Sequence, residues 1–306
     1  MKHVYKLSLI LSLFFLTNNS IAQTDSSQKK SYFKLNLNYL SNAVYFGRKD
    51  SSAIPYLRSS ISYFDKSGFY VSSGVAMLVS ADEPKRIDLI NIDAGYNFSI
   101  KKLDAGVYAS KFFYSNASFA VGSELKGLVG IYAGYDLDVL HLNMGGDVLF
   151  STNTDFSTSL GLSHPFESGE ENNKWTITPT VQLNAGTQYF NEAYYEFRKF
   201  SFPTTSSSGS GTSSKGKGKG HSNSSNSGSG GSTTAKTITF YDKTKFTILD
   251  YEISLPVNYD NKRWGLFALP VIAIPVHPAT FAIDNAIQKE KLSTAFFIEI
   301  GGYIKF

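Results

Sequence analysis

Trp175-Thr176-Ile177-Thr178-Pro179-Thr180-Val181-Gln182-Leu183-Asn184-Ala185 is the stretch of sequence that decides the fold. Its odd-numbered residues are apolar or proline, and its even-numbered residues are polar. Successive side chains of a β-strand point to opposite faces, so a period of two places one face in an apolar medium and the other in a polar one. The same alternation runs through Phe33–Tyr39 and Leu249–Leu255. The chain is therefore expected to be all-β.

Alternation of this kind, bounded by turn residues, recurs along the chain and predicts about twelve strands. They lie near residues 32–46, 53–64, 69–80, 87–100, 102–114, 124–135, 138–151, 155–164, 174–190, 245–259, 263–276 and 291–306. The segment 263–276 is apolar on both faces, which a plug, a packed inner face or a miscounted strand would each explain. Ten or fourteen strands therefore remain open alternatives.

The first 22 residues have the pattern of a cleaved export signal. Lys2 and Lys6 precede the short apolar run Leu7–Leu16, and Ser20-Ile21-Ala22 supplies the small residues of a cleavage site before Gln23. Residues 23–306 then form one barrel domain, a length that β barrels reach undivided. No later window is long and apolar enough for a membrane-spanning helix. If the exported chain enters a membrane, only a closed barrel satisfies its backbone there.

The connections between the predicted strands alternate in length. The expected inner turns are residues 65–68, 101, 136–137 and 260–262, with one longer inner connection at 165–174. The outer connections include residues 81–86, 116–122, 191–244 and 277–290. Short turns at one end and long loops at the other are typical of a transmembrane barrel.

Aromatic residues on the apolar face gather near the strand ends, which predicts two girdles at the two membrane interfaces. The inner set is Phe33, Tyr63, Phe69, Phe98, Tyr135, Trp175, Tyr259 and Trp264, and the outer set is Tyr45, Phe113, Phe150, Phe156 and Tyr189.

The C-terminal segment Leu292–Phe306 alternates and ends on an aromatic residue. With the features above, it makes the chain resemble the outer-membrane β-barrel proteins of Gram-negative, two-membrane bacteria as a general class, without a functional subfamily. The resemblance implies an antiparallel up-and-down transmembrane barrel in the bacterial outer membrane, a monomer in contact with outer-membrane lipids and lipopolysaccharide. It also implies that barrel-assembly machinery reads the C-terminal strand, with Tyr303 and Phe306 as its signal.

Residues 201–236 interrupt the barrel domain with a Ser/Gly/Lys-rich composition that cannot bury enough apolar surface to fold. The segment is expected to be a disordered, basic extracellular loop with an anionic surface partner as one role. Its nearest match to a phosphate-binding loop, Gly211–Gly218, ends on glycine where serine or threonine must bind Mg²⁺. Phosphate chemistry is therefore not expected.

The inward positions of the strands carry the candidate lumen residues. They are Lys34, Arg58, Asp93, Asp104, Lys126, His141, Asp147, Asp250, Glu252 and Glu299. The excess of acids over bases predicts a mild preference for cations if the lumen conducts. A twelve-stranded barrel lies between side-chain-filled and open sizes, so both a filled lumen and a narrow pore remain open.

The amino-acid composition excludes several kinds of functional site. The chain of 306 residues has no cysteine, which excludes a disulfide scaffold, thiolate catalysis and Cys-ligated metals. Its charge of +4 forms no Lys/Arg stripe, so no nucleic-acid partner is expected. His141, His164, His221 and His277 show no metal-ligand spacing, and no catalytic, cofactor-binding or metal-binding residue is predicted.

The sequence thus predicts a non-enzymatic barrel, serving as a narrow diffusion channel for small solutes or as a structural and surface-interaction protein. One alternative is a barrel hydrolase, with His277 and Asp284 at the outer rim or with the adjacent Ser163 and His164. Another alternative is a soluble exported β-sandwich that binds a ligand.

Overall fold

The computed structural model describes residues 30–50, 52–81, 84–118, 120–121, 123–170, 172–190, 238–283 and 286–306. The expected export signal at 1–22 and the Ser/Gly/Lys-rich segment at 201–236 lie outside the described residues. No helix among the described residues is long and apolar enough to cross a membrane.

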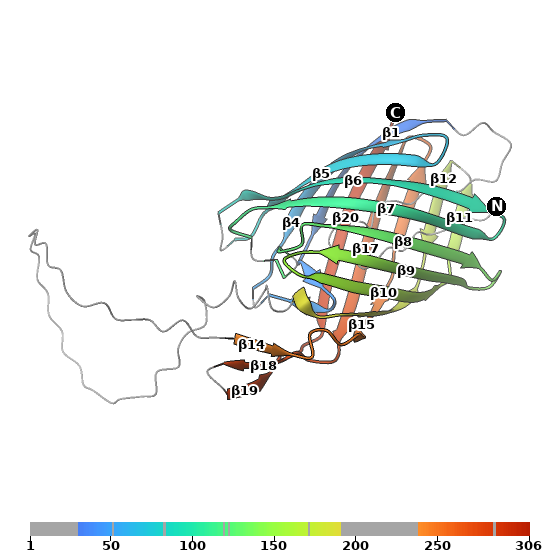
Figure 1. The fold of residues 1–306 in the computed structure, drawn as a ribbon. Coiled ribbons are helices and arrows are strands. Elements are labelled where there is room, and N and C mark those ends of the chain that lie inside the picture. Colours follow the sequence, from blue (N-terminus) through green and yellow to red (C-terminus); the bar gives the residue numbers. More distant parts are fainter. Residues whose placement is uncertain are drawn as a thin grey trace, which may run out of the picture.

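One antiparallel sheet closes on itself, because β1 pairs with β4 on one side and with β20 on the other, and β20 pairs with β17. The closed barrel, seen from the side in Figure 1, has 12 strands. Its successive strands are β1 (Tyr32–Leu40), β4 (Tyr56–Phe64), β5 (Phe69–Leu78), β6 (Arg86–Ile100), β7 (Leu103–Tyr114), β8 (Gly127–Asp136), β9 (His141–Phe150), β10 (Thr154–Ser163) continued by β11 (Phe166–Glu170), β12 (Asn173–Ile177) continued by β13 (Thr180–Gly186), β15 (Thr247–Ser254) continued by β16 (Val257–Asn261), β17 (Trp264–Pro275) and β20 (Ala295–Lys305). The predicted strand number is confirmed, and a two-sheet sandwich is excluded.

Prolines divide three of the strands. Proline cannot donate to the strand ladder, and Pro165, Pro179 and Pro256 stand where β10/β11, β12/β13 and β15/β16 are interrupted. Proline carbonyls still accept hydrogen bonds across these breaks, from His164 N to Pro179 O (3.2 Å) and from Thr178 N to Pro256 O (2.9 Å). The sheet therefore stays continuous through the breaks.

The inner end of the barrel, which holds the short turns and the last strand's C-terminus, is tighter than predicted. The expected ten-residue connection at 165–174 is wrong, because β11 and β12 pair from Phe166 with Ile177 to Glu170 with Asn173. Gly169, at φ 108°, takes the left-handed conformation near the tip. The sequence around this tip, from Glu167 to Lys174, is polar or glycine at every position, so this part of the strand pair lacks the alternation that marks the other strands.

Asp65 organises the first inner turn. Its carboxylate accepts hydrogen bonds from Ser67 N (2.9 Å), Ser31 Oγ (3.0 Å) and Tyr63 Oη (3.1 Å). The bonds from Ser67 come first among the causes that hold the pKa of Asp65 well below its usual value. A lowered pKa means that the turn is stabilised above the ordinary carboxyl range and loses this support as the pH falls.

The barrel exterior is apolar between two sets of aromatic rings. At the inner end, Phe33, Trp175 and Trp264 are 45%, 51% and 41% exposed, and the ring of Tyr259 lies 5.0 and 5.3 Å from those of Trp175 and Trp264. At the outer end, Phe113, Phe150 and Phe156 are exposed outward. A closed antiparallel barrel with such a belt is the architecture of a bacterial outer-membrane protein.

Two members of the predicted outer girdle are wrong. Tyr45 is 3% exposed and lies inside the barrel, where its ring is 5.1 Å from that of Phe190. Tyr189 is half-buried, and its backbone N–H donates to Asp155 Oδ1 at 2.8 Å. Both belong to loops that turn into the barrel mouth, which strand periodicity does not reveal.

Tyrosine rings cross glycines on neighbouring strands inside the barrel. Four such pairs stand directly opposite each other in the ladders: Tyr70 with Gly95, Tyr108 with Gly130, Tyr132 with Gly106, and Tyr303 with Gly265. A Cβ on Gly106 would lie 2.5 Å from Cε1 of Tyr132, and one on Gly265 would lie 2.5 Å from Cζ of Tyr303. Glycine is required at these positions so that each ring can lie against the wall.

Replacing Gly106 with alanine is therefore expected to destabilise the barrel by about 1–3 kcal/mol, the usual result of overpacking. Gly146→Ala is the matched control, because the nearest atom to its Cβ would be 3.8 Å away. Urea unfolding of both variants in lipid vesicles, compared with the unmodified chain, measures the difference. Equal losses for the two variants would contradict the ring-packing explanation.

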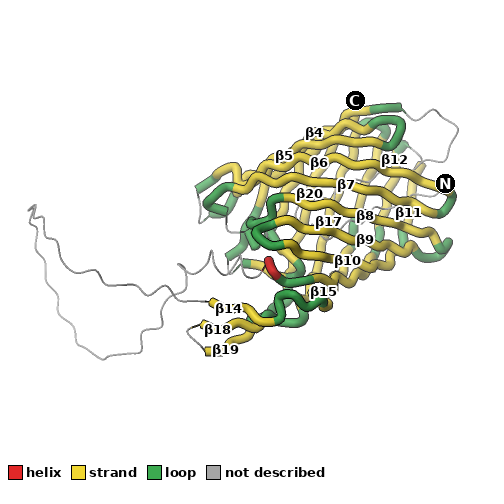
Figure 2. Tube along the Cα trace, viewed as in Figure 1, coloured by secondary structure: helices red, strands yellow, loops and turns green. Residues whose placement is uncertain are grey.

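Beyond the outer end, the chain forms a separate small sheet. β14 (Ile238–Tyr241), β18 (Thr280–Ile283) and β19 (Ala286–Lys289) pair in the order β14-β18-β19. Figure 2 shows these strands projecting past the barrel. One face is closed by Phe240 against Phe281, and all of β19 is exposed.

Candidate functional site

The segment 41–55, between β1 and β4, folds into the outer mouth of the barrel and is called the plug here. The predicted strand 32–46 is too long, because β1 ends at Leu40 and the chain then turns inward to β2 (Val44–Tyr45) and β3 (Arg48–Lys49). Phe46 and Gly47 have positive φ values of 48° and 72° at the tip of this hairpin. A Cβ on Gly47 would lie 2.9 Å from Cβ of Pro275, at the outer end of β17, so the tip touches the inner wall.

An apolar collar surrounds the plug. The last inward positions of the barrel strands carry Leu40, Leu78, Leu89, Phe112, Leu128, Leu149, Leu249, Val271, Ala273, Ala295 and Phe297, each at most 3% exposed. Together with Val44, Tyr45, Phe46, Ile54 and Phe190 they form one buried cluster. This packing explains why segment 263–276 is apolar on both faces: one face meets the collar and the other the exterior. The outer mouth is therefore sealed by apolar contact.

Hydrogen bonds fix the base of the plug. Ala43 N donates to Ile54 O at 3.0 Å, and Ile54 N donates to Asn42 Oδ1 at 2.8 Å, so the two ends of the plug lie side by side. Asp155, 3% exposed, accepts the N–H of Phe190 at 2.9 Å and thereby positions the ring that packs on the plug.

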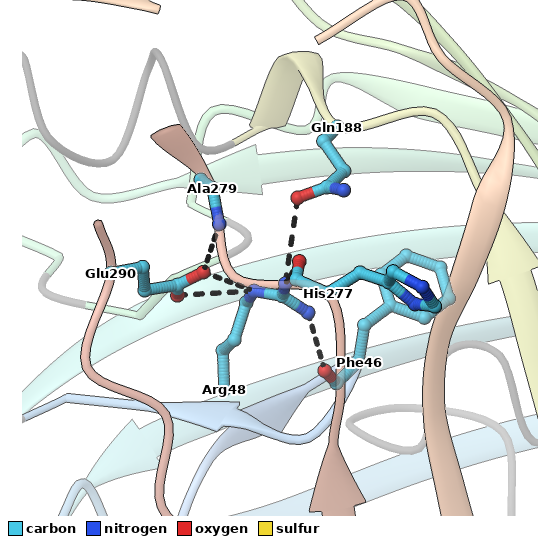
Figure 3. Close-up of polar contacts among 6 residues, drawn as sticks. All are labelled: Phe46, Arg48, Gln188, His277, Ala279 and Glu290. Carbon is cyan, nitrogen blue, oxygen red and sulfur yellow. Dashed lines mark hydrogen bonds and ion pairs between the residues drawn. The ribbon is translucent and has the colours of Figure 1, made fainter. Parts of the chain in front are cut away.

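Arg48 makes the polar attachment of the plug, shown in Figure 3. Its Nε donates to both carboxylate oxygens of Glu290, at 3.1 and 3.2 Å. Its Nη1 donates to Phe46 O at 3.0 Å, and its Nη2 donates to His277 O at 3.3 Å and to Gln188 Oε1 at 3.5 Å. One guanidinium thus joins the plug to two outer connections that are far apart in the sequence, one at Gln188 and the other at residues 277–290.

Below the plug the inner face of the barrel is polar. Nine of the ten lumen candidates are buried on this face, at exposures from 0% to 8%: Lys34, Arg58, Asp93, Asp104, His141, Asp147, Asp250, Glu252 and Glu299. Lys126 is different, because β8 begins only at Gly127 and the Lys126 side chain is exposed at the outer end instead of buried in the lumen.

Several of these candidates are brought together across the strands. Arg58 forms an ion pair with Glu299, and Asn38 Nδ2 donates to the same carboxylate at 2.5 Å. This cluster lies across β4, β1 and β20, where the barrel closes, and Glu299 is 0% exposed.

Other acids receive only neutral donors from the wall. Asp147 accepts the hydroxyl of Tyr108 and, at 3.4 Å, that of Ser157. Asn184 Nδ2 donates to Asp250 Oδ1 at 2.9 Å. These hydrogen bonds come from neutral groups, and Asp250 also interacts electrostatically with Arg48 of the plug.

Acids greatly outnumber bases among the buried charged residues that the structure describes. On the inner face, six carboxylates, Asp93, Asp104, Asp147, Asp250, Glu252 and Glu299, stand against two bases, Lys34 and Arg58, and each of these residues is at most 7% exposed. Four more buried acids, Asp50, Asp88, Asp136 and Asp155, lie in the plug or at strand ends, and Asp88 pairs with Arg86. The interior is an electronegative chamber even though the whole chain is basic.

The chamber is less tightly filled than the mouth. Inward-facing Ser60, Ser72, Asn97 and Gly301 are only half-buried, in contrast to the collar. The outer half of the lumen is therefore apolar and packed, and the inner half is polar with a few half-buried positions. A narrow pore through the inner half stays a prediction.

The candidate catalytic histidines occupy structural positions. His277 Nδ1 lies 2.8 Å from Ile248 O, and its own carbonyl accepts a bond from Arg48. His164 contacts Val139 O and packs edge-on against Phe166 at 4.5 Å. Asp284 lies outside the described residues. Within the described ranges, no three His, Asp or Glu side chains gather as a metal site.

No protein-family model matches the sequence, and no curated protein matches it. Among solved structures, the chain is similar to the KdgM porin, with a TM-score of 0.43, 9% identity, and coverage of 89% of this chain and 99% of that one. It is similar to the NanC porin, with a TM-score of 0.42, 8% identity, and coverage of 90% and 100%. It also resembles the COG4313 outer membrane channel from Pseudomonas putida F1, with a TM-score of 0.41, 8% identity, and coverage of 93% and 100%.

Proposed function

We propose that this outer-membrane barrel is a narrow, non-enzymatic diffusion channel that prefers small cations, and that the plug closes its outer mouth. The excess of buried acids in the chamber is the observation that carries the proposal. A barrel with a purely structural role is expected to pair its buried charges, because an unpaired buried charge is costly. Here six buried carboxylates of the inner face stand against two basic side chains, so mobile cations are the natural compensation.

The plug has to move aside for conduction, because the plug and the apolar collar pack against each other across the outer mouth. Hydrophobic constrictions close channels by excluding water. An open reference state is obtained by replacing residues 44–53 with two glycines, which keeps the hydrogen bond between Ala43 and Ile54 at the base of the plug. This variant is called the unplugged variant below.

Cation preference in the unplugged variant tests the proposal. A KCl gradient across a planar bilayer should give a reversal potential of the sign for cation preference. Asp93→Asn with Asp147→Asn should lower the cation-to-anion permeability ratio by about twofold or more, because two wall charges are removed. Asp242→Asn is the control, since Asp242 is exposed outside the barrel. An anion-selective pore, or equal effects of the chamber and control changes, would contradict the proposal.

A structural and surface-interaction role is the second candidate, favoured by the sealed mouth and by the small sheet that projects beyond it. Its distinguishing outcome is an unplugged variant that inserts into bilayers and conducts no ions.

The partners of the chain follow from the same proposal. Outer-membrane lipids, including lipopolysaccharide, contact the apolar belt, and the barrel acts as a monomer. Barrel-assembly machinery reads the last strand through Tyr303 and Phe306, of which Phe306 is 66% exposed on the exterior and Tyr303 faces the lumen. The basic segment 201–236 contacts an anionic surface partner.

A further inference from the structure

Glu290 contacts both the plug and the outer hairpin formed by β18 and β19. Its carboxylate binds Arg48 of the plug, and its Oε2 accepts the N–H of Ala279 at 3.0 Å. Its own N–H donates to Ala279 O at 2.8 Å, which closes the base of the hairpin formed by β18 and β19. The same residue therefore fastens the outer hairpin and the plug.

The Arg48–Glu290 pair is well shielded, since the two side chains are 4% and 8% exposed. Breaking an ion pair in such surroundings is costly, because removing one partner leaves the other as a buried charge without its counter-ion. The remaining acceptors of Arg48 are neutral: the carbonyls of Phe46 and His277 and the amide of Gln188. Glu290 is thus the carboxylate that anchors the guanidinium in Figure 3.

The hairpin is accessible from outside, whereas the apolar tip of the plug is buried. All four residues of β19 are exposed, and Ile287 is 71% exposed. Val44, Tyr45 and Phe46 of the plug are at most 3% exposed. The exposed hairpin is thus joined to the buried tip of the plug through Glu290 and Arg48.

We propose that the Arg48–Glu290 ion pair is the latch of this channel, and that displacement of the β18–β19 hairpin withdraws Glu290, releases the plug and opens the lumen. The inference rests on the proposed channel function and adds its regulation. It gives the small outer sheet a mechanical role in addition to its position on the surface.

Charge reversal tests the latch. In single-channel recordings, Arg48→Glu and Glu290→Arg are each expected to raise the ratio of open to closed time by roughly 10- to 100-fold, because each leaves a buried charge unpaired. The combined exchange Arg48→Glu/Glu290→Arg should restore closure. Lys49→Glu is the matched control, because Lys49 is the next residue on β3 and is exposed.

Two results separate the latch from the channel proposal. Open times that do not differ between Arg48→Glu and Lys49→Glu, with a conducting unplugged variant, would overturn the latch and leave the channel. An unplugged variant that inserts without conducting would overturn the channel itself, and the latch with it. Glu290→Gln is a milder second variant if the charge reversals fail to fold, with an expected rise of about tenfold.

The coupling between the hairpin and the open time of the channel can be tested separately. Because the chain has no cysteine, one introduced cysteine can be labelled specifically. Ile287→Cys carries a biotin, and streptavidin is added on the outer side during recording. We expect the open time to rise about tenfold. A biotin at Thr152→Cys, in the exposed loop between β9 and β10, should give no change. Equal responses at the two sites, or none at Ile287, would overturn the coupling.

Discussion

The unplugged variant is expected to conduct at least about tenfold more current than the unmodified chain, because it loses the apolar constriction at the outer mouth. The physical reason is the arrangement of the lumen in two halves. The collar and plug exclude water at the outer end, and the chamber below them is polar and acidic. Planar-bilayer recording of refolded protein at equal KCl concentrations measures the effect.

A loop change of matched size is the control for this experiment. The connection 79–85, also at the outer end, can be shortened with glycines, and the collar should keep the mouth closed. An equal rise in conductance in both variants would show that the plug has no specific role in closing the outer mouth.

Arg58→Met is expected to lower the free energy of unfolding by about 3–5 kcal/mol, the usual cost of leaving a buried partner charged and alone. Arg58 and Glu299 pair across the strands where the barrel closes, and Glu299 is 0% exposed. Asn38 can still donate to Glu299, but an amide does not supply the missing charge. Urea unfolding in lipid vesicles, followed by the gel mobility of the folded barrel, measures the loss.

Two further variants isolate the charge effect. Arg58→Met/Glu299→Leu removes both charges and is expected to recover most of the stability, since an apolar pair of similar volume is often neutral or better. Lys102→Met breaks the exposed pair with Asp138 and should cost less than about 1 kcal/mol. A double variant as unstable as Arg58→Met would contradict this explanation.

The barrel could be predicted from the sequence because alternation is a local property. Each strand meets lipid on one side and the lumen on the other, so the pattern in Phe33–Tyr39 requires no knowledge of distant residues. The connection at 165–174 was wrong for a related reason. Residues 167–174 are polar or glycine at every position, and backbone pairing without alternation leaves no periodic signal.

The plug could not be predicted, because its direction depends on packing between distant segments. Tyr45 and Phe46 read as the end of a strand, and only their contact with Phe190 places them inside. The sequence holds one signal that was missed. Inward positions change from polar to apolar at the outer end of strands, as from Asn38 to Leu40 and from Ser110 to Phe112.

The chamber was partly predictable. Inward acids in the strand centres, such as Asp93 and Asp147, follow from alternation alone. Their partners do not, because the Arg58–Glu299 pair depends on which strands meet when the barrel closes. Lys126 shows that alternation does not predict side-chain direction at a strand boundary. Because β8 begins only at Gly127, the Lys126 side chain does not enter the lumen.

The contact between the apolar face and lipid is tested most directly by the two tryptophans. Trp175 and Trp264 are the chain's only tryptophans, and both lie on the exterior at the inner end. Their fluorescence is measured in vesicles whose lipids carry bromine at chosen depths, with Trp175→Phe and Trp264→Phe to separate the two signals. We expect each tryptophan to be quenched by brominated lipid, more strongly by bromine near the headgroup than by bromine near the bilayer centre. Quenching by aqueous iodide with no response to brominated lipid at any depth would contradict a barrel that spans the membrane.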